Sequence, residues 1–169
     1  PGEAKFGMTK AQLLQGYKDL KAKGVKQFGL HAFLASNTVT NNYYPTLAGQ
    51  LFELALEIRE ETGVELNFIN LSGGIGIDYS PADIALIGQG VHEKFDRILV
   101  PNGLGQIKIF TELGRFMLAP HGHLVTKVLH LKDTYRHYVG VDASAVNLLR
   151  PAMYDAYHHI TNVSNPEGP

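Results

Sequence analysis

The sequence predicts an α/β fold in which a parallel sheet with helices is followed by a β-rich region. In the first two thirds of the chain, segments with apolar residues at helical spacing alternate three times with short apolar runs. That alternation is the pattern of βα units, whose strands run parallel in one sheet. After about Pro120, two β-branched runs follow each other without a helix of useful length between them. We therefore expect a domain boundary close to residues 119–122.

The expected helices begin at a cap or a proline, and the first two end at a glycine. Thr9 can cap the first helix, and Pro81 stands where the first turn of the third helix would begin. Gly24 and Gly63 follow the last periodic residues of the first two helices. The expected helices cover residues 10–24, 46–63 and 81–99. The expected strands cover residues 25–35, 64–72, 105–113, 123–134 and 135–144.

The composition excludes several classes of function. The chain has 169 residues, the size of one ordinary domain, and its formal net charge of -1 gives no reason to expect nucleic acid or a membrane as a partner. It contains no cysteine, which rules out disulfides and thiol chemistry and is compatible with the cytoplasmic location that we expect. No apolar stretch reaches the roughly 18 residues of a membrane-spanning helix. The last residues resemble the start of a loop, so we expect the chain to be a piece of a longer protein.

Polar groups follow each of the three expected parallel strands. The strand ends read LASN, LSGGIG and TELGR, and they offer the Ser36 hydroxyl, the N–H groups of Gly73 and Gly74, and the pair Glu112 and Arg115. Ligands of parallel α/β folds bind at this edge of the sheet, and bare N–H groups with an arginine suit a phosphate. Taken singly, a Gly-Gly pair after a strand is more often a plain turn, and a Glu and an Arg three residues apart are more often a local ion pair. On this evidence alone, both interpretations stay open.

Four longer stretches carry a more specific signal. They are GLHAFLASN at 29–37, INLSGGIGI at 69–77, TELGRFMLAPHGHLVTKV at 111–128 and VGVDASAVNLLRPAMYDAYHHI at 139–160. In order and spacing they resemble the fold type III pyridoxal-phosphate-dependent decarboxylases. The resemblance implies that residues 1–120 form the later portion of a cofactor-binding (β/α)8 TIM barrel of the alanine-racemase-like type. It also implies that residues 121–169 form the first strands of a C-terminal β domain.

The resemblance implies a binding site for the phosphate of pyridoxal 5'-phosphate. Gly73 and Gly74 match the glycine run that holds this phosphate in the family, with Ser72 in place of the first glycine. Ser36 matches a serine that assists the phosphate or the neighbouring ring. We expect Gly76 to add its N–H group to the same cradle.

Five residues match positions that contact the cofactor ring or the substrate. Glu112 matches the acid that pairs with the pyridine nitrogen, and Phe33 stands where the family has a histidine stacked on the ring. Arg115 matches an arginine placed near the phosphate and the substrate carboxylate. Arg150 and Tyr154 match a pair that grips the distal end of the substrate, where an arginine can bind a second carboxylate bidentately.

The sequence departs from the family pattern at several positions. Phe33 replaces the ring-stacking histidine, Ala35 replaces the next glycine, and Leu113 replaces a proline. Phe33 can still stack, and His31 points to the same face of its strand and can share the role. The family's Schiff-base lysine lies in an early strand with the pattern Tyr-Ala-x-Lys-Ala-Asn, which has no counterpart here. We therefore expect no catalytic residue in this chain, and no activity from it alone.

The implied reaction is a decarboxylation. A second carboxylate for Arg150 favours meso-2,6-diaminopimelate, which would yield L-lysine and CO2 in the last step of lysine biosynthesis. The alternatives are a decarboxylase of another basic amino acid or of a carboxylated polyamine, such as ornithine, arginine or carboxynorspermidine, and a non-catalytic homologue that acts as a binding scaffold. The family's site is completed across a dimer, so we expect a homodimer of the parent enzyme. His158 and His159 would face opposite ways on a strand, so we expect no metal site.

Overall fold

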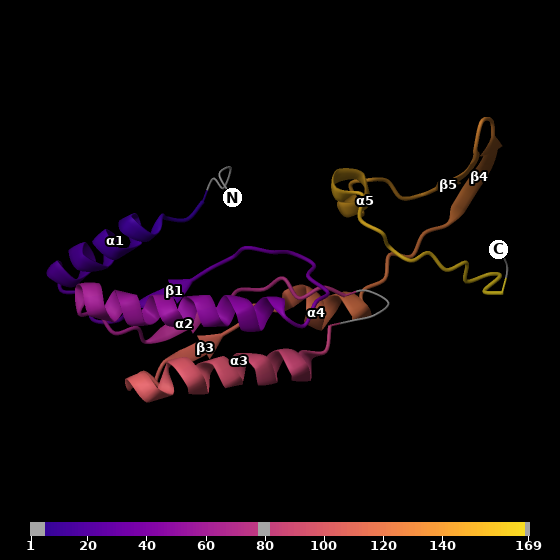
Figure 1. Cartoon of the computed structure of the whole chain (residues 1–169). Helices are drawn as coiled ribbons and strands as arrows, with labels where there is room; N and C mark the ends of the chain where they lie inside the picture. The colour runs from indigo at the N-terminus through magenta and orange to yellow at the C-terminus, as the bar shows by residue number, and fades with distance from the viewer. Residues whose placement is uncertain (1–5, 78–81, 168–169) are drawn as a thin grey trace. The chain divides into compact units, whose positions relative to one another are not determined.

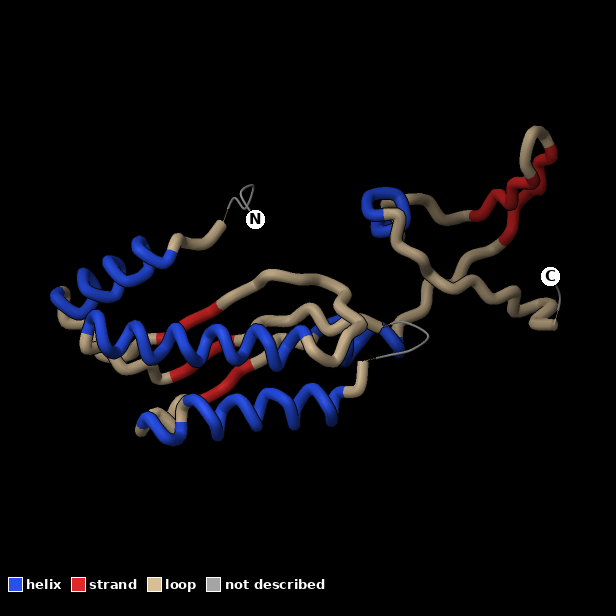
Figure 2. The backbone as a smooth tube through the Cα atoms, in the orientation of Figure 1, coloured by secondary structure: helices blue, strands red, loops and turns tan. Residues whose placement is uncertain are grey.

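The computed structural model describes residues 6–77 and 82–167. The chain divides into two compact units, residues 1–121 and residues 122–169 (Figure 1). Most of the regular structure of the first unit is helical. Most of the regular structure of the second unit is a hairpin of two strands (Figure 2). Within the described residues, no helix is both long enough and apolar enough to cross a bilayer.

The first unit contains a parallel sheet of three short strands in the order β1-β2-β3. The strands are β1 (Gly29–His31), β2 (Phe68–Asn70) and β3 (Lys108–Phe110). Leu30 is paired with Ile69, and Ile69 with Ile109, so these three side chains point to the same face. The predicted α/β fold with parallel strands is thereby confirmed.

Three long helices precede the strands in turn. They are α1 (Lys10–Ala22), α2 (Tyr43–Thr62) and α3 (Ile84–Ile98). Thr9 caps α1 as predicted: the N–H of Gln12 donates to Thr9 Oγ1 at 3.4 Å, and the N–H of Thr9 donates to Gln12 Oε1 at 2.9 Å. Helix α2 ends at Gly63, which has φ 62° in the left-handed region and closes the helix as expected.

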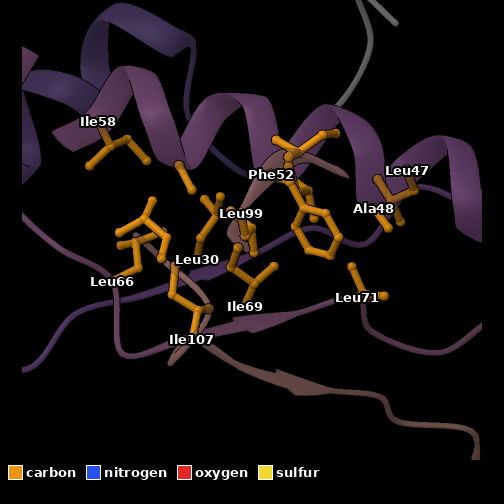
Figure 3. Close-up of a cluster of buried hydrophobic side chains, with 14 of the residues drawn as sticks. Leu30, Leu47, Ala48, Phe52, Ile58, Leu66, Ile69, Leu71, Leu99 and Ile107 are labelled. Atoms are coloured by element: carbon orange, nitrogen blue, oxygen red, sulfur yellow. The ribbon is translucent and has the colours of Figure 1, made fainter. Parts of the chain in front are cut away.

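The core lies between the helices and one face of the sheet. Leu30 and Ile69 point into it, and Phe52 from α2 packs among them with no exposed surface (Figure 3). On the opposite face, the rings of Phe68 and Phe110 meet edge to face at 5.7 Å, and both are more than one third exposed. The sheet is therefore covered on one face by its own helices, and its other face carries aromatic side chains.

The second unit contains an antiparallel hairpin and a short helix. The elements are β4 (Val128–Asp133), β5 (His137–Val141) and α5 (Leu149–Tyr154). The Asp142 carboxylate closes the open end of the hairpin by accepting hydrogen bonds from Thr126 Oγ1 at 2.6 Å and the Lys127 N–H at 2.8 Å. These two hydrogen bonds lower the pKa of Asp142.

The predicted elements occur in the predicted order, but several bounds were wrong. Helix α2 begins at Tyr43, three residues before the expected start, and α3 begins at Ile84 because Asp83 caps it by accepting from the N–H groups of Ala85 and Leu86. Pro81 lies outside the described residues. The strands span only three residues each in the parallel ladder, because pairing stops where the chain turns into loops.

Two short α-helices were missed altogether, as were the 3-10 helices η1 (Val100–Asn102) and η2 (Ala119–His121). Helix α4 (Gly114–Leu118) follows β3, and α5 follows the hairpin. Each is six residues or fewer, which is too short for apolar periodicity to stand out in a sequence. His158 and His159 lie in irregular structure after α5, so the argument that placed them on a strand was wrong.

Candidate functional site

The ends of the three parallel strands form a pocket with a volume of about 160 Å³. Every residue that the resemblance assigns to the cofactor lines it, although these residues are distant in the sequence. They are Phe33, Ser36, Gly73, Gly74, Glu112 and Arg115. Three further residues, Asn37, Ser72 and Ile75, complete the lining. The strand ends therefore converge as the parallel topology predicts.

Two glycines allow the strand ends to come into backbone contact. A Cβ on Gly73 would collide with the carbonyl oxygen of Glu112, just after β3. A Cβ on Gly74 would collide with the carbonyl oxygen of Ala35, just after β1, and Gly74 also has φ 111°, which side chains rarely adopt. Both glycines are therefore required by the packing of the protein's own backbone.

The backbone donors of the glycine turn differ in availability. Within the described part of the chain, the N–H groups of Gly73 and Gly74 donate to no protein atom, so they can serve a ligand. The N–H of Gly76 donates to the Thr38 carbonyl oxygen at 2.8 Å, and the N–H of Thr38 donates to the Gly74 carbonyl oxygen at 2.7 Å. The expectation that Gly76 offers an N–H to an anion is wrong, because this bridge already uses it.

The carboxylate of Glu112 is held by a neighbouring strand. Asn70, the last residue of β2, donates from Nδ2 to Glu112 Oε1 at 2.7 Å. The backbone adds a second link, since the N–H of Glu112 donates to the Ser72 carbonyl oxygen at 2.8 Å. Asn70 was not among the predicted site residues, because its partner Glu112 lies 42 positions away in the sequence.

Ser72 occupies an unusual backbone conformation. Its φ is 60°, in the left-handed region, and only 2% of the residue is exposed. A glycine adopts this conformation without strain, whereas a residue with a Cβ pays about 1–2 kcal/mol. Ser72 therefore stands at a position where a glycine would be free of this strain.

The aromatic and tyrosine side chains near the pocket have distinct environments. Phe33 lines the pocket while remaining 63% exposed, and His31, two residues earlier on β1, does not line it. Tyr44 lies beneath the glycine turn, with its hydroxyl oxygen 3.6 Å from where a Cβ on Gly74 would stand. Burial raises the pKa of Tyr44.

The two residues expected at the distal end of the substrate lie on α5 in the second unit. Arg150 Nη1 lies 3.3 Å from His158 Nε2, and Tyr154 is 67% exposed. Arg150 and Tyr154 lie four residues apart on this short helix, so their side chains start from the same side of it. Among the described residues there is no group of three or more His, Asp or Glu side chains that could hold a metal ion.

Comparison with known proteins decides the family. Residues 2–119 match the family described as pyridoxal-dependent decarboxylase, pyridoxal binding domain, and residues 77–169 match the one described as pyridoxal-dependent decarboxylase, C-terminal sheet domain. The chain belongs to the pyridoxal-dependent decarboxylases. The resemblance inferred from the sequence motifs is confirmed, and the cofactor of this family is pyridoxal phosphate.

Curated relatives of this chain include two with about one third identical residues. Protein TabA of Pseudomonas amygdali pv. tabaci is 35% identical over 94% of this chain and 38% of its own length. A diaminopimelate decarboxylase of Methanothermobacter thermautotrophicus is 34% identical over 96% of this chain and 39% of its own length. The decarboxylase chain therefore spans about two fifths of the length of the relatives that it matches.

Solved structures agree with this assignment. The diaminopimelate decarboxylase of Helicobacter pylori, crystallised in complex with L-lysine, is 27% identical, with a TM-score of 0.80 over 98% of this chain and 41% of that one. A diaminopimelate decarboxylase of Methanocaldococcus jannaschii is 25% identical, with a TM-score of 0.80 over 93% of this chain and 37% of that one. Both likenesses extend over nearly all of the decarboxylase chain.

Proposed function

We propose that this chain is part of a pyridoxal-phosphate-dependent carboxy-lyase that converts meso-2,6-diaminopimelate to L-lysine and CO2, the last step of lysine biosynthesis. The observation that carries the proposal is the pocket at the strand ends. There the unused N–H groups of Gly73 and Gly74 lie with Ser36 and Arg115, a set of donors that suits a phosphate. Glu112 lines the same pocket and suits a protonated ring nitrogen.

The cofactor would supply the electron sink that decarboxylation at an α-carbon requires. In this pocket Glu112 would hold a proton on the ring nitrogen, because a carboxylate at hydrogen-bond distance stabilises the protonated form. Phe33 would stack on the ring in place of the family's histidine, by contact alone. Arg115 would orient the phosphate and the substrate carboxylate. A Cβ at Gly73 or Gly74 would disturb this cradle, because it would collide with the carbonyl oxygen of Glu112 or Ala35.

The substrate assignment is supported by relatives and by α5. Several relatives are named diaminopimelate decarboxylase, and the H. pylori enzyme of that name was crystallised with L-lysine. Arg150 can bind a second carboxylate bidentately, and the Tyr154 hydroxyl can add a hydrogen bond. Ornithine and arginine have no distal carboxylate and would leave Arg150 without that partner.

The same proposal covers the architecture of the parent protein. Residues 1–120 would be the later portion of a (β/α)8 barrel that binds the cofactor, and residues 121–169 the opening strands of the C-terminal β domain. The parent enzyme would be a cytoplasmic homodimer whose site is completed by other parts of the chain. The 169 residues alone would be inactive, since they contain no match to the lysine motif that carries the cofactor in this family.

The test uses the full-length protein that contains this chain. We would supply pyridoxal phosphate and meso-diaminopimelate and measure lysine release, with ornithine and arginine as competing substrates. Preferential formation of lysine is the expected result. If ornithine, arginine or a carboxylated polyamine is turned over in preference to meso-diaminopimelate, the substrate assignment is overturned. The assignment as a decarboxylase then still holds.

A non-catalytic scaffold is the second candidate, and Phe33 and Ala35 are the observations that favour it. Both depart from the family pattern beside the cofactor pocket. In this case the full-length protein would bind the cofactor and turn over none of the amino acids. The full-length sequence gives a second test, because a scaffold has no need of the lysine motif upstream of Pro1.

A further inference from the structure

The side chain of Asn70 joins two parts of the pocket that come from different strands. Its Nδ2 donates to Glu112 Oε1 at 2.7 Å, and its Oδ1 accepts from the N–H of Ser72 at 2.8 Å. Glu112 follows β3, and Ser72 begins the glycine turn that follows β2. One amide group therefore connects the carboxylate of the pocket to the turn that presents the Gly73 and Gly74 N–H groups.

Only an amide of this size satisfies both partners. The N–H of Ser72 can only donate, so it requires an acceptor, while an ionised Glu112 carboxylate can only accept, so it requires a donor. An aspartate at position 70 would keep the first hydrogen bond and set two carboxylates against each other at the second. An alanine would lose both. The chemistry of the two partners thus also fixes which way the Asn70 amide points.

The backbone of Asn70 is itself held on both sides. In the sheet it is paired with His31 on β1 and with Phe110 on β3. The N–H of the next residue, Leu71, donates to the Phe110 carbonyl oxygen at 2.9 Å. A polar side chain that starts from a central strand and bonds at both ends has little freedom to move. Asn70 is therefore a fixed reference point for Glu112.

We propose that Asn70 is a positioning residue that sets the place of the Glu112 carboxylate relative to the glycine turn. This role rests on the proposed function. The Asn70 side chain would then determine the spacing between the Glu112 carboxylate, which meets the cofactor ring, and the N–H groups of the glycine turn, which bind its phosphate. Because the ring nitrogen and the phosphate belong to one small molecule and are joined by a short linkage, an error in that spacing weakens both contacts together.

The experiment compares the full-length protein with its Asn70→Ala, Asn70→Asp and Asn67→Ala variants. Asn67 is a matched control: its Oδ1 accepts from the N–H of Phe28 at 2.8 Å, at the opposite end of β2 from the pocket. The affinity of each apoprotein for pyridoxal phosphate is measured by titration, followed by the absorbance of the bound cofactor across pH. Thermal unfolding of the apoproteins records stability separately.

We expect Asn70→Ala to weaken cofactor binding about tenfold or more, because a hydrogen bond to a charged group is lost. Asn67→Ala should lose stability and keep the affinity of the parent protein. In Asn70→Asp the two facing carboxylates share one proton and release it as the pH rises. Cofactor affinity of this variant should therefore fall with rising pH over a range in which the parent stays level. Among the described residues, two further titratable groups lie near this pair: Arg115 lines the same pocket, and His31 is paired with Asn70 in the sheet.

The outcomes separate the two proposals. Equal cofactor affinity of the parent and Asn70→Ala, or an Asn70→Asp affinity that follows the parent at every pH, overturns the positioning role alone. A parent protein that binds no pyridoxal phosphate overturns the proposed function and the positioning role with it. If Asn70→Ala does not fold, the pH profile of Asn70→Asp, whose side chain has the same shape, gives the decision.

Discussion

The carbonyl oxygen of Glu112 occupies the space that a Cβ on Gly73 would need. The two residues follow different strands, β3 and β2, so this contact brings the ends of both strands together at the pocket. Glu112 also lines the pocket, so a shift of its backbone would move its side chain within the site. Gly73 is therefore a packing requirement and a part of the candidate site at once.

Gly73→Ala should lower both stability and cofactor affinity. The added methyl group must push the strand ends apart, and overpacking of this kind costs about 1–3 kcal/mol. Because the displaced backbone is that of Glu112, the carboxylate moves with it. We expect a lower midpoint in urea unfolding of the full-length protein and weaker binding of pyridoxal phosphate.

Gly16→Ala is the control for this substitution. A Cβ on Gly16 would meet no atom within 4 Å, and the residue lies inside α1. Alanine is favoured over glycine in a helix interior by about 0.5–1 kcal/mol, so this variant should be at least as stable as the parent. Equal effects of the two substitutions would contradict the steric explanation.

The stability of variants at position 72 should follow how easily each residue adopts the left-handed backbone conformation. With φ at 60°, glycine is unstrained, serine is tolerated, and a β-branched residue is strained most. We expect Ser72→Val to be less stable than Ser72→Gly by about 2 kcal/mol. Urea unfolding of both variants measures the difference, and a valine variant as stable as the glycine variant would show that the turn had changed shape.

Much of the fold was predictable because its signals are local. The capping box at Thr9 and Gln12 and the left-handed Gly63 each depend on a few adjacent residues, and these ends were found. Strand lengths were not, because the extent of pairing depends on where the neighbouring chain turns away. Asp83 was overlooked as the cap of α3, since Pro81 offered a competing signal two residues earlier.

The site was predictable in part for a related reason. Glu112, Arg115 and the glycines belong to motifs that stand out in the sequence, and parallel topology brings strand ends together. The role of Asn70 depends on a hydrogen bond to a residue 42 positions away, which no local pattern reveals. The same holds for Gly76, whose N–H is taken by Thr38 through a bridge that only the folded chain forms.

Arg150→Ala should raise KM for meso-diaminopimelate selectively. The distal carboxylate of the substrate would lose its charged hydrogen-bond donor, which corresponds to an increase in KM of about tenfold or more. Arg136→Ala is the control, because Arg136 lies in the turn between β4 and β5 and has no proposed substrate contact. Steady-state kinetics of the full-length variants measure the effect. An unchanged KM for Arg150→Ala would contradict its proposed role.

Tyr17 should make the protein sensitive to alkali. Its hydroxyl donates to the Gly29 carbonyl oxygen at 2.7 Å, and burial raises its pKa to about 12. In the unfolded chain the pKa of tyrosine is about 10. Below pH 10 both states keep the proton, so the full stabilisation is present. Between about pH 10 and pH 12 only the unfolded state releases it, so the free energy of unfolding should fall with rising pH, by up to about 3 kcal/mol.

Tyr17→Phe isolates this contribution. At neutral pH the variant should lose about 1 kcal/mol, because the Gly29 carbonyl oxygen loses its donor. Above pH 10 its free energy of unfolding should decline less steeply than that of the parent, since no proton remains at this position to be released. Some slope will persist, because burial also raises the pKa values of Tyr43 and Tyr44. Parallel declines for variant and parent in alkaline urea titrations would show that Tyr17 is not the group responsible.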